Sequence, residues 1–205
     1  MPRSVVATDN FNRASLGANW AQLRPFDGSI EIDSSTRLGA NSLGAGRWVG
    51  AGTFTADQYA VLKLTTLGFG GGERIGVIVR ASGDIDTNRD YYSFLDNNTG
   101  AVAQLIKTVN GTETILDSRS SPFAAGDTIE LEVEGTTLRA FRNGTLIYSL
   151  TDSSLSTGNP GALNEQTGNV FGDDWEGGNI TTVQLGEPAL FGGQTIYRLP
   201  AQRWG

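Results

Sequence analysis

Residues 127–134, which read Asp-Thr-Ile-Glu-Leu-Glu-Val-Glu, constrain the fold more than any other segment of this chain. Apolar side chains at positions 129, 131 and 133 alternate with glutamates at 130, 132 and 134. Successive side chains of a strand point to opposite faces of a sheet, so the alternation predicts a strand with one buried and one solvated face. A sheet of this kind needs a second layer to cover its apolar face.

Two Asn-Gly pairs predict hairpins that extend this sheet pattern. Asn-Gly favours a two-residue turn because both turn positions need φ > 0. The pair at 143–144 predicts that Arg142 faces Thr145, Phe141 faces Leu146, Ala140 faces Ile147 and Arg139 faces Tyr148. The pair at 110–111 predicts that Ile106 faces Ile115 and that Leu105 faces Leu116.

Turn residues separate further short apolar runs, which predict strands at 29–32, 48–49, 59–67, 74–80, 91–95 and 180–185. No window of about 12 residues shows a helical stripe. We therefore predict an all-β sandwich of two packed antiparallel sheets over residues 1–185. Residues 186–205 stand apart and are expected to form an extended C-terminal tail. Its apolar and aromatic residues, among them Phe191, Tyr197 and Trp204, predict a docking segment.

The residue types that are absent exclude several chemistries. The chain has no Cys and no His, so it has no thiolate nucleophile, no Ser–His–Asp triad and no imidazole base or ligand. Its net charge of −7 makes nucleic acid an unexpected partner. No apolar run approaches the roughly 20 residues that span a bilayer, and the first residues lack the apolar core of a signal peptide. We therefore expect synthesis in a cytoplasm without membrane insertion.

Several local motifs, in their order along the chain, resemble concanavalin A-like, laminin-G-like jelly-roll domains. These motifs are Asp-Asn-Phe-Asn-Arg at 9–13 with Leu-Gly-Ala-Asn-Trp at 16–20, the strand at 75–82 with the tyrosines at 91–92, the block 126–153, and the closing segments 158–162 and 173–175. The resemblance covers about residues 5–185 and implies a jelly-roll sandwich. The superfamily includes lectins, carbohydrate-binding modules, glycoside hydrolases, lyases, adhesion domains and phage virion proteins, so fold alone does not decide function.

The leading expectation is a non-catalytic surface or structural protein of a virion, with a lectin-like fold that serves glycan binding or host adhesion. Such a protein assembles in the host cytoplasm, which agrees with the absent signal peptide. Its partners would be other virion proteins or copies of itself, held through the tail, and a cell-surface polysaccharide. A secreted carbohydrate-binding module is the alternative location and role.

Sugar binding needs aromatic faces together with polar groups that form hydrogen bonds. The candidates for glycan contacts are Trp48, Tyr91, Tyr92, Phe141, Tyr148 and Trp175. Arg80, within an apolar strand, is either a buried structural arginine paired with a loop acid or a ligand contact.

The alternative activity is glycoside hydrolysis, which needs two carboxylates flanking the scissile bond. Glu130, Glu132 and Glu134 line one face of a strand at intervals of about 6.5–7 Å. Outward acids on an edge-facing strand also serve solubility, and this structural interpretation is favoured over catalysis.

No cofactor is required, but a structural calcium ion is a candidate. Calcium takes about six to eight oxygen ligands. Asp9 would meet Asp173 and Asp174 if the first and last strands are neighbours, as they often are in jelly rolls. The loop that carries Asp84, Asp86, Asn88 and Asp90 is a second acidic candidate. All of these residues are also common turn formers.

Overall fold

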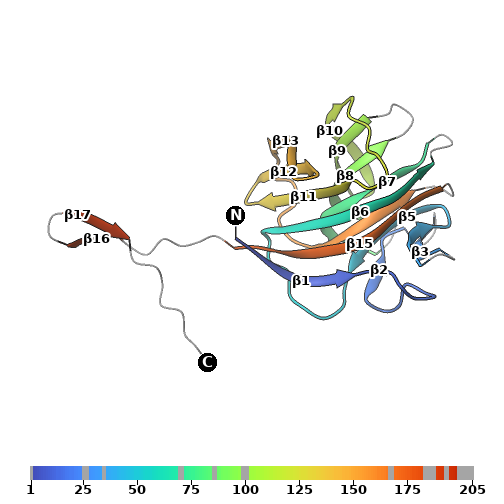
Figure 1. The fold of residues 1–205 in the computed structure, drawn as a ribbon, viewed down its shortest axis with the longest axis horizontal. Helices are drawn as coiled ribbons and strands as arrows, with labels where there is room; N and C mark the ends of the chain where they lie inside the picture. Colours follow the sequence, from blue (N-terminus) through green and yellow to red (C-terminus); the bar gives the residue numbers. More distant parts are fainter. Residues whose placement is uncertain are drawn as a thin grey trace.

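The structure is a computed structural model that describes residues 2–24, 28–33, 36–68, 72–84, 87–97, 102–165, 169–181, 188–191 and 194–197 (Figure 1). The described residues form strands, turns and loops, and no helix among them is long and apolar enough to cross a membrane. Most strands belong to two antiparallel sheets that pack face to face. The predicted all-β jelly-roll sandwich is confirmed.

The first sheet has eight strands among the described residues. In spatial order they are β13 (Thr145–Thr151), β12 (Thr137–Arg142), β11 (Thr128–Glu134), β6 (Gln58–Gly68), β15 (Asn169–Ile180), β4 (Leu38–Ala40) and β3 (Ile30–Ile32), with β1 (Arg3–Asp9) also beside β15. Figure 1 shows β11, β6, β15 and β1 side by side across one layer. β15, the last strand of the sandwich, therefore pairs directly with β1, the first strand.

The second sheet has seven strands in the described part of the chain. Their order is β10 (Thr112–Arg119), β9 (Val102–Val109), β8 (Asp90–Asn97), β7 (Arg74–Ser82), β14 (Asn159–Glu165), β5 (Leu43–Trp48) and β2 (Trp20–Gln22). β2 and β5 thus form the edge opposite β10. This edge carries Trp20 and Trp48.

The main core lies between the two sheets. The alternation in β11 is confirmed, because Ile129, Leu131 and Val133 are fully buried in this core. β8 of the opposite sheet contributes Tyr92 and Phe94. At about 25 cal/mol per Å² of apolar surface, burial between the sheets is the main favourable contribution to folding.

The second sheet also buries residues on its other face. Ile78, Tyr91, Leu95, Ile106 and Leu163 belong to a separate buried cluster there. A chain of ion pairs adjoins this cluster and runs from Arg24 through Glu165 and Arg74 to Glu113. These apolar side chains are therefore core residues and not a surface for ligands.

Both hairpins have the predicted turns, but their strand register differs from the prediction beyond the residues next to each turn. Arg142 faces Thr145, Phe141 faces Leu146 and Ile106 faces Ile115, as predicted. In each hairpin a β-bulge then inserts one residue. Tyr148 consequently faces Ala140 instead of Arg139, and Asp117 instead of Leu116 faces Leu105. A one-residue shift moves a side chain to the other face of a sheet.

The predicted strand at 180–185 agrees with the structure at Ile180 and is wrong at Thr181. β15 ends at Ile180, Thr181 lies outside any strand, and residues 182–185 are outside the described residues. The strand lies earlier in the chain, over a glycine- and aspartate-rich segment.

The predicted tail contains two short strands, β16 (Pro188–Phe191) and β17 (Gln194–Tyr197), which pair with each other. Neither pairs with another strand in the described parts of the chain. Phe191 and Tyr197 lie in these strands, whereas Trp204 is outside the described residues. The division of the chain at residue 185 stays a prediction.

Arg80 is a structural arginine, the first of the two expected roles. Its buried guanidinium donates hydrogen bonds to the carbonyl oxygens of Ala56, Leu155 and Gly135 at 2.9, 2.7 and 2.7 Å. Asp57 is 3.7 Å from the same group. One side chain therefore joins three loops at one end of the sandwich.

A buried carboxyl group on β8 makes the stability depend on pH. Asp96 is fully buried and accepts a hydrogen bond from the Phe123 amide at 2.9 Å, and no group in the described segments hydrogen-bonds to its Oδ1 atom. Burial raises its pKa to about 6. An acid with a raised pKa stabilises the fold below its ordinary pKa, and this contribution is lost as the pH rises toward 6.

Asp96→Asn is therefore expected to raise the free energy of unfolding by about 1–2 kcal/mol at neutral pH, because it removes a buried charge. Its advantage over the wild type should shrink as the pH falls below 6. Urea unfolding across this pH range measures both effects, with Asp117→Asn on the edge strand β10 as the control. A variant that is less stable than the wild type at pH 7 would contradict the assignment.

Candidate functional site

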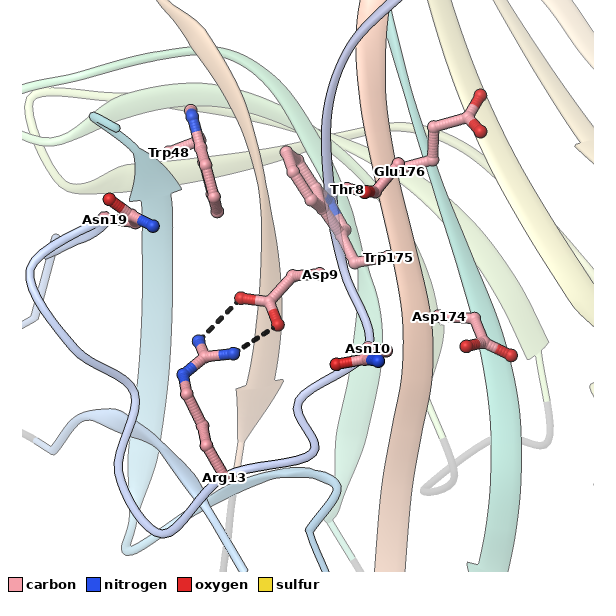
Figure 2. A pocket seen from close by; sticks show the side chains of 9 residues that line it. All are labelled: Thr8, Asp9, Asn10, Arg13, Asn19, Trp48, Asp174, Trp175 and Glu176. Atoms are coloured by element: carbon pink, nitrogen blue, oxygen red, sulfur yellow. Dashed lines mark hydrogen bonds and ion pairs between the residues drawn. The ribbon is translucent and has the colours of Figure 1, made fainter. Parts of the chain in front are cut away.

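A cavity of about 500 Å³ lies where β1 ends beside β15. Its lining comprises Thr8, Asp9, Asn10, Arg13, Asn19, Trp48, Asp174, Trp175 and Glu176 (Figure 2). These residues come from the first strand, the loop after it, the edge of the second sheet and the last long strand. The cavity therefore exists only when both sheets are assembled.

The edge of β15 is open at this point because its neighbours on that side stop short. β1 pairs with β15 as far as Asp9, opposite Trp175, and β4 pairs with it at Gly172. Between these contacts the register of β15 against β6 shifts from Asp173 to Glu176, which is a β-bulge. Asp174 has φ = 48°, a backbone conformation that Asp and Asn adopt more readily than most residues. Bulges of this kind re-aim side chains near functional sites.

The Asp9 carboxylate organises the inner wall of the cavity. It accepts hydrogen bonds from the Arg13 guanidinium at 2.5 and 2.6 Å, from the Trp20 indole at 2.7 Å and from the Phe11 amide at 2.8 Å. Burial alone would raise the pKa of Asp9, but these donors outweigh it and hold the pKa below its ordinary value. Asp9 is therefore an ionised structural group.

The loop after β1 has a strained and tightly held shape. Phe11 is fully buried with φ = 51°, which is uncommon for a bulky side chain. Arg13 also donates to the Leu16 carbonyl oxygen at 2.7 Å, so one guanidinium joins both ends of the loop. Strain of this kind persists only where the surroundings hold it in place. The loop presents Asn10 at a fixed position on the cavity rim.

Three indoles pack beneath the cavity. Trp48 and Trp175 stack with ring centroids 5.6 Å apart, and Trp20 contacts both rings edge-on. Trp175 donates to the Gly161 carbonyl oxygen at 3.1 Å. Trp175 is 1% exposed and Trp48 is 7% exposed. The indoles thus form a rigid apolar base, and a ligand reaches only small parts of them.

Polar side chains form the rim. Thr8, Asn10, Asn19 and Asp174 are exposed. In Figure 2, Asp9, Arg13, Asn19 and the two indoles lie on one side of β15, while the carboxylates of Asp174 and Glu176 point to the other side. Glu176 accepts a hydrogen bond from the Tyr59 hydroxyl at 2.7 Å. Amide, hydroxyl and carboxylate groups over an apolar base suit a ligand with many hydroxyls.

The structure brings part of the predicted calcium site to this cavity. Asp9 and Asp174 both line it, as expected if the first and last strands are neighbours. The oxygens of Asp9 already accept four hydrogen bonds, and Asp173 accepts one from the Asp174 amide. In the described ranges no group of three or more acidic side chains is arranged to hold a metal ion. Calcium stays a prediction.

The second acidic loop is held by its own side chains. Asn88 donates to Asp84 at 2.9 Å, and the Asp90 carboxylate accepts from the Asn110 amide at 2.7 Å. Asp86 lies outside the described residues. These contacts are those of turn-forming residues.

The predicted glycan contacts separate into two groups. Trp48 and Trp175 line the cavity, but at 7% and 1% exposed they offer a ligand only small parts of their rings. Tyr91, Tyr92 and Tyr148 are corrected, because each is at most 1% exposed and offers no ring face to a sugar. The bulge in β13 turns Tyr148 inward, where its hydroxyl donates to the Ala103 carbonyl oxygen.

Phe141 is half-buried on β12, a strand that is not adjacent to β15, and it does not line the cavity. Its role as a glycan contact has no further support.

The glutamate row lies on an inner strand, because β11 pairs with both β6 and β12. The expected edge-facing position is therefore wrong. Arg3 forms ion pairs with Glu130 and Glu132, and Arg139 lies 3.1 Å from Glu134. Burial raises the pKa of Glu130 despite its contact with Arg3. Each glutamate of the row thus has a cationic partner.

Sequence reasoning did not nominate Thr8, Asn10, Arg13, Asn19 or Glu176 as site residues. Asn10, Arg13 and Asn19 belong to the two N-terminal motifs, and Glu176 follows the closing motif at 173–175. The available signal was the joint occurrence of these motifs at opposite ends of the chain.

No protein-family model matches this sequence, and no curated protein matches it. Solved structures do share its fold. A protein of unknown function with a galectin-like fold from Bacillus subtilis has a TM-score of 0.61 at 11% identity, covering 87% of this chain and 97% of that one. The carbohydrate-binding module CBM66 from the same organism has a TM-score of 0.59 at 14% identity, covering 77% and 92%. A β-glucanase from Bacillus licheniformis has a TM-score of 0.50 at 13% identity, covering 87% and 99%.

These similarities show the fold alone. The chain has the concanavalin A-like jelly-roll fold that its motifs resemble, and both binding modules and hydrolases share it. Function must therefore be argued from the site.

Asp9→Asn is expected to lower the free energy of unfolding by about 2–4 kcal/mol at neutral pH, because it leaves a half-buried Arg13 without its counter-charge. A carboxylate with a lowered pKa stabilises the fold above its ordinary pKa, and this contribution is lost as the pH falls. The gap between variant and wild type should therefore narrow in acid.

Urea unfolding at several pH values measures this gap. Asp33→Asn is the matched control, since Asp33 forms the same (i, i+4) pair with Arg37 but its side chain is more exposed than that of Asp9, 14% against 3%. An Asp9 variant that loses no more stability than the Asp33 variant would contradict the central role of Asp9.

Proposed function

We propose that this protein is a non-catalytic carbohydrate-binding protein and that the cavity beside β1 and β15 is its sugar site. The observation that carries the proposal is the lining itself, which combines exposed amide and hydroxyl groups with an indole base. Sugars present many hydroxyl groups, and the exposed amide and hydroxyl groups of the rim can form hydrogen bonds with them, while the buried indoles keep the base of the site apolar.

The rigidity of the site supports the same proposal. Asp9 and Arg13 hold the loop that carries Asn10, and the stacked indoles hold the base. A preformed site loses little conformational entropy when a ligand binds. The structural similarity to a carbohydrate-binding module agrees with this role.

Glycoside hydrolysis is the second candidate, since a β-glucanase shares the fold. The raised pKa of Glu130 is a property that a general acid needs. Its neighbour Glu132 is 2% exposed, and Arg3 bridges the two carboxylates. A catalytic pair must flank an accessible bond, so this arrangement favours a structural role.

We further propose that this protein carries out its carbohydrate binding on the surface of a virion. Residues 186–205 would be the docking segment. The support is the hairpin β16–β17, which pairs with no strand in the described part of the sandwich. A two-stranded hairpin alone is marginally stable in water, so a partner would complete it.

Screening the chain against an array of neutral and charged glycans is expected to identify a ligand. Asn19→Ala should weaken its binding about tenfold, because it removes one amide from the rim. Thr114→Ala on β10, at the opposite edge of the second sheet, should bind like the wild type.

Equal binding by the two variants would place the sugar elsewhere. Release of reducing ends from a bound polysaccharide, abolished by Glu132→Gln, would establish the hydrolase in place of the binding protein.

Deletion of residues 186–205 is expected to leave the sandwich folded and to abolish assembly. Analytical ultracentrifugation of the full chain, alone and with the proteins encoded beside it, should show assemblies that the shortened chain does not form. An unchanged circular dichroism spectrum and thermal midpoint would establish folding of the shortened chain. Assembly of the shortened chain at the normal level would overturn the docking role.

A further inference from the structure

Some of the charged side chains that line the cavity are neutralised by a partner of opposite charge, and others are not. Its lining contains one base, Arg13, and three acids, Asp9, Asp174 and Glu176, so the formal sum is 1 − 3 = −2. Asp9 and Arg13 neutralise each other through two short hydrogen bonds. The remaining negative charge therefore lies on Asp174 and Glu176, which project from β15 on the same side (Figure 2).

These two carboxylates have weak partners. Glu176 accepts a hydrogen bond from the neutral Tyr59 hydroxyl. The Oδ2 atom of Asp174 is 3.8 Å from the Lys63 ammonium, beyond hydrogen-bond distance, and both side chains are more than half exposed. An exposed pair of this kind contributes little and exchanges easily. Lys63 thus shows where an ammonium group approaches this rim without being fixed there.

Neighbouring acids add to the negative potential. Asp173 precedes Asp174, and its burial together with the Asp174 charge raises its pKa. Arg3, which also lies near Tyr59, is already paired with Glu130 and Glu132. The chain as a whole carries −7, which attracts cationic ligands over longer distances.

We propose that the ligand of this site is a glycan with free amino groups, and that its protonated amine binds at Asp174 and Glu176 while an adjoining sugar occupies the cavity. This inference rests on the proposed function and names its ligand class. The bulge in β15 places both carboxylates on one side of the strand, and the cavity lining on the other side adjoins them (Figure 2), so an extended chain that crosses the end of β1 meets both sides of the rim.

The test compares a β-1,4-linked glucosamine hexamer with its fully N-acetylated form, which has the same backbone without the charge. Isothermal titration calorimetry in low-salt buffer at about pH 6, above the ordinary pKa of a carboxyl group, is expected to show at least about fivefold tighter binding of the free amine. This preference should shrink as salt is added.

Two variants are expected to shift the preference in opposite directions. Asp174→Asn should weaken binding of the amine hexamer about fivefold and leave the acetylated hexamer unchanged. Asn tolerates the positive φ of this position, so the bulge is retained. Lys63→Gln should strengthen binding of the amine hexamer, because it removes the competing ammonium. Thr114→Ala is again the control.

The outcomes separate the two proposals. If the acetylated hexamer binds as well as the amine, or if Lys63→Gln fails to strengthen binding, the amine preference is wrong and the sugar site can still stand. If neither hexamer nor any other glycan binds, the proposed function itself is wrong. If binding of the amine requires added calcium, a bound metal ion and not the amine is the group that the carboxylates recognise.

Discussion

The ionised carboxylate of Asp9 is the interaction on which the cavity depends. A buried carboxylate is costly unless several donors satisfy it, and here donors from a guanidinium, an indole and a backbone amide surround it. These donors come from one short segment, residues 11–20, so a single charge fixes the loop and positions the central indole. The indole cluster in turn joins the two sheets. The Asp9 carboxylate therefore fixes both the local shape of the loop and the position of the indole through which the two sheets pack.

The charged side chains on the two sides of the cavity rim differ in how they are paired. On the inner side, Asp9 and Arg13 cancel, and the result is rigidity. On the outer side, Asp174 lies 3.8 Å from the Lys63 ammonium and Glu176 accepts a hydrogen bond from the neutral Tyr59 hydroxyl, so neither carboxylate has a tightly bound cationic partner in the described part of the chain. A paired buried charge specifies structure, whereas a weakly paired exposed charge next to a cavity provides recognition. The glutamate row on β11 resembles the inner side, because Arg3 and Arg139 compensate it.

Local sequence patterns predicted the fold well where strands alternate and turns contain Asn-Gly. β11 and the residues next to both turns have the expected faces and partners. The prediction failed after the bulges, because an inserted residue leaves no mark in a pattern of period two and reverses every later face. Tyr148 is the clearest case, since the shift makes a residue predicted to contact glycans part of the core. β15 escaped prediction because its glycines and aspartates are poor strand formers by propensity.

The sequence by itself determined an all-β sandwich, because hydrophobic period and turn chemistry are local properties. It also nominated Trp48, Trp175, Asp9 and Asp174 for two different sites. Only the tertiary structure decided that these four residues share one cavity, because β1 pairs with β15 across more than 160 residues of intervening chain. It also decided which carboxylates are neutralised, since Arg3 reaches Glu130 and Glu132 only because distant strands pack side by side. Burial and charge compensation are properties of the assembled sheets, so no local pattern could reveal them.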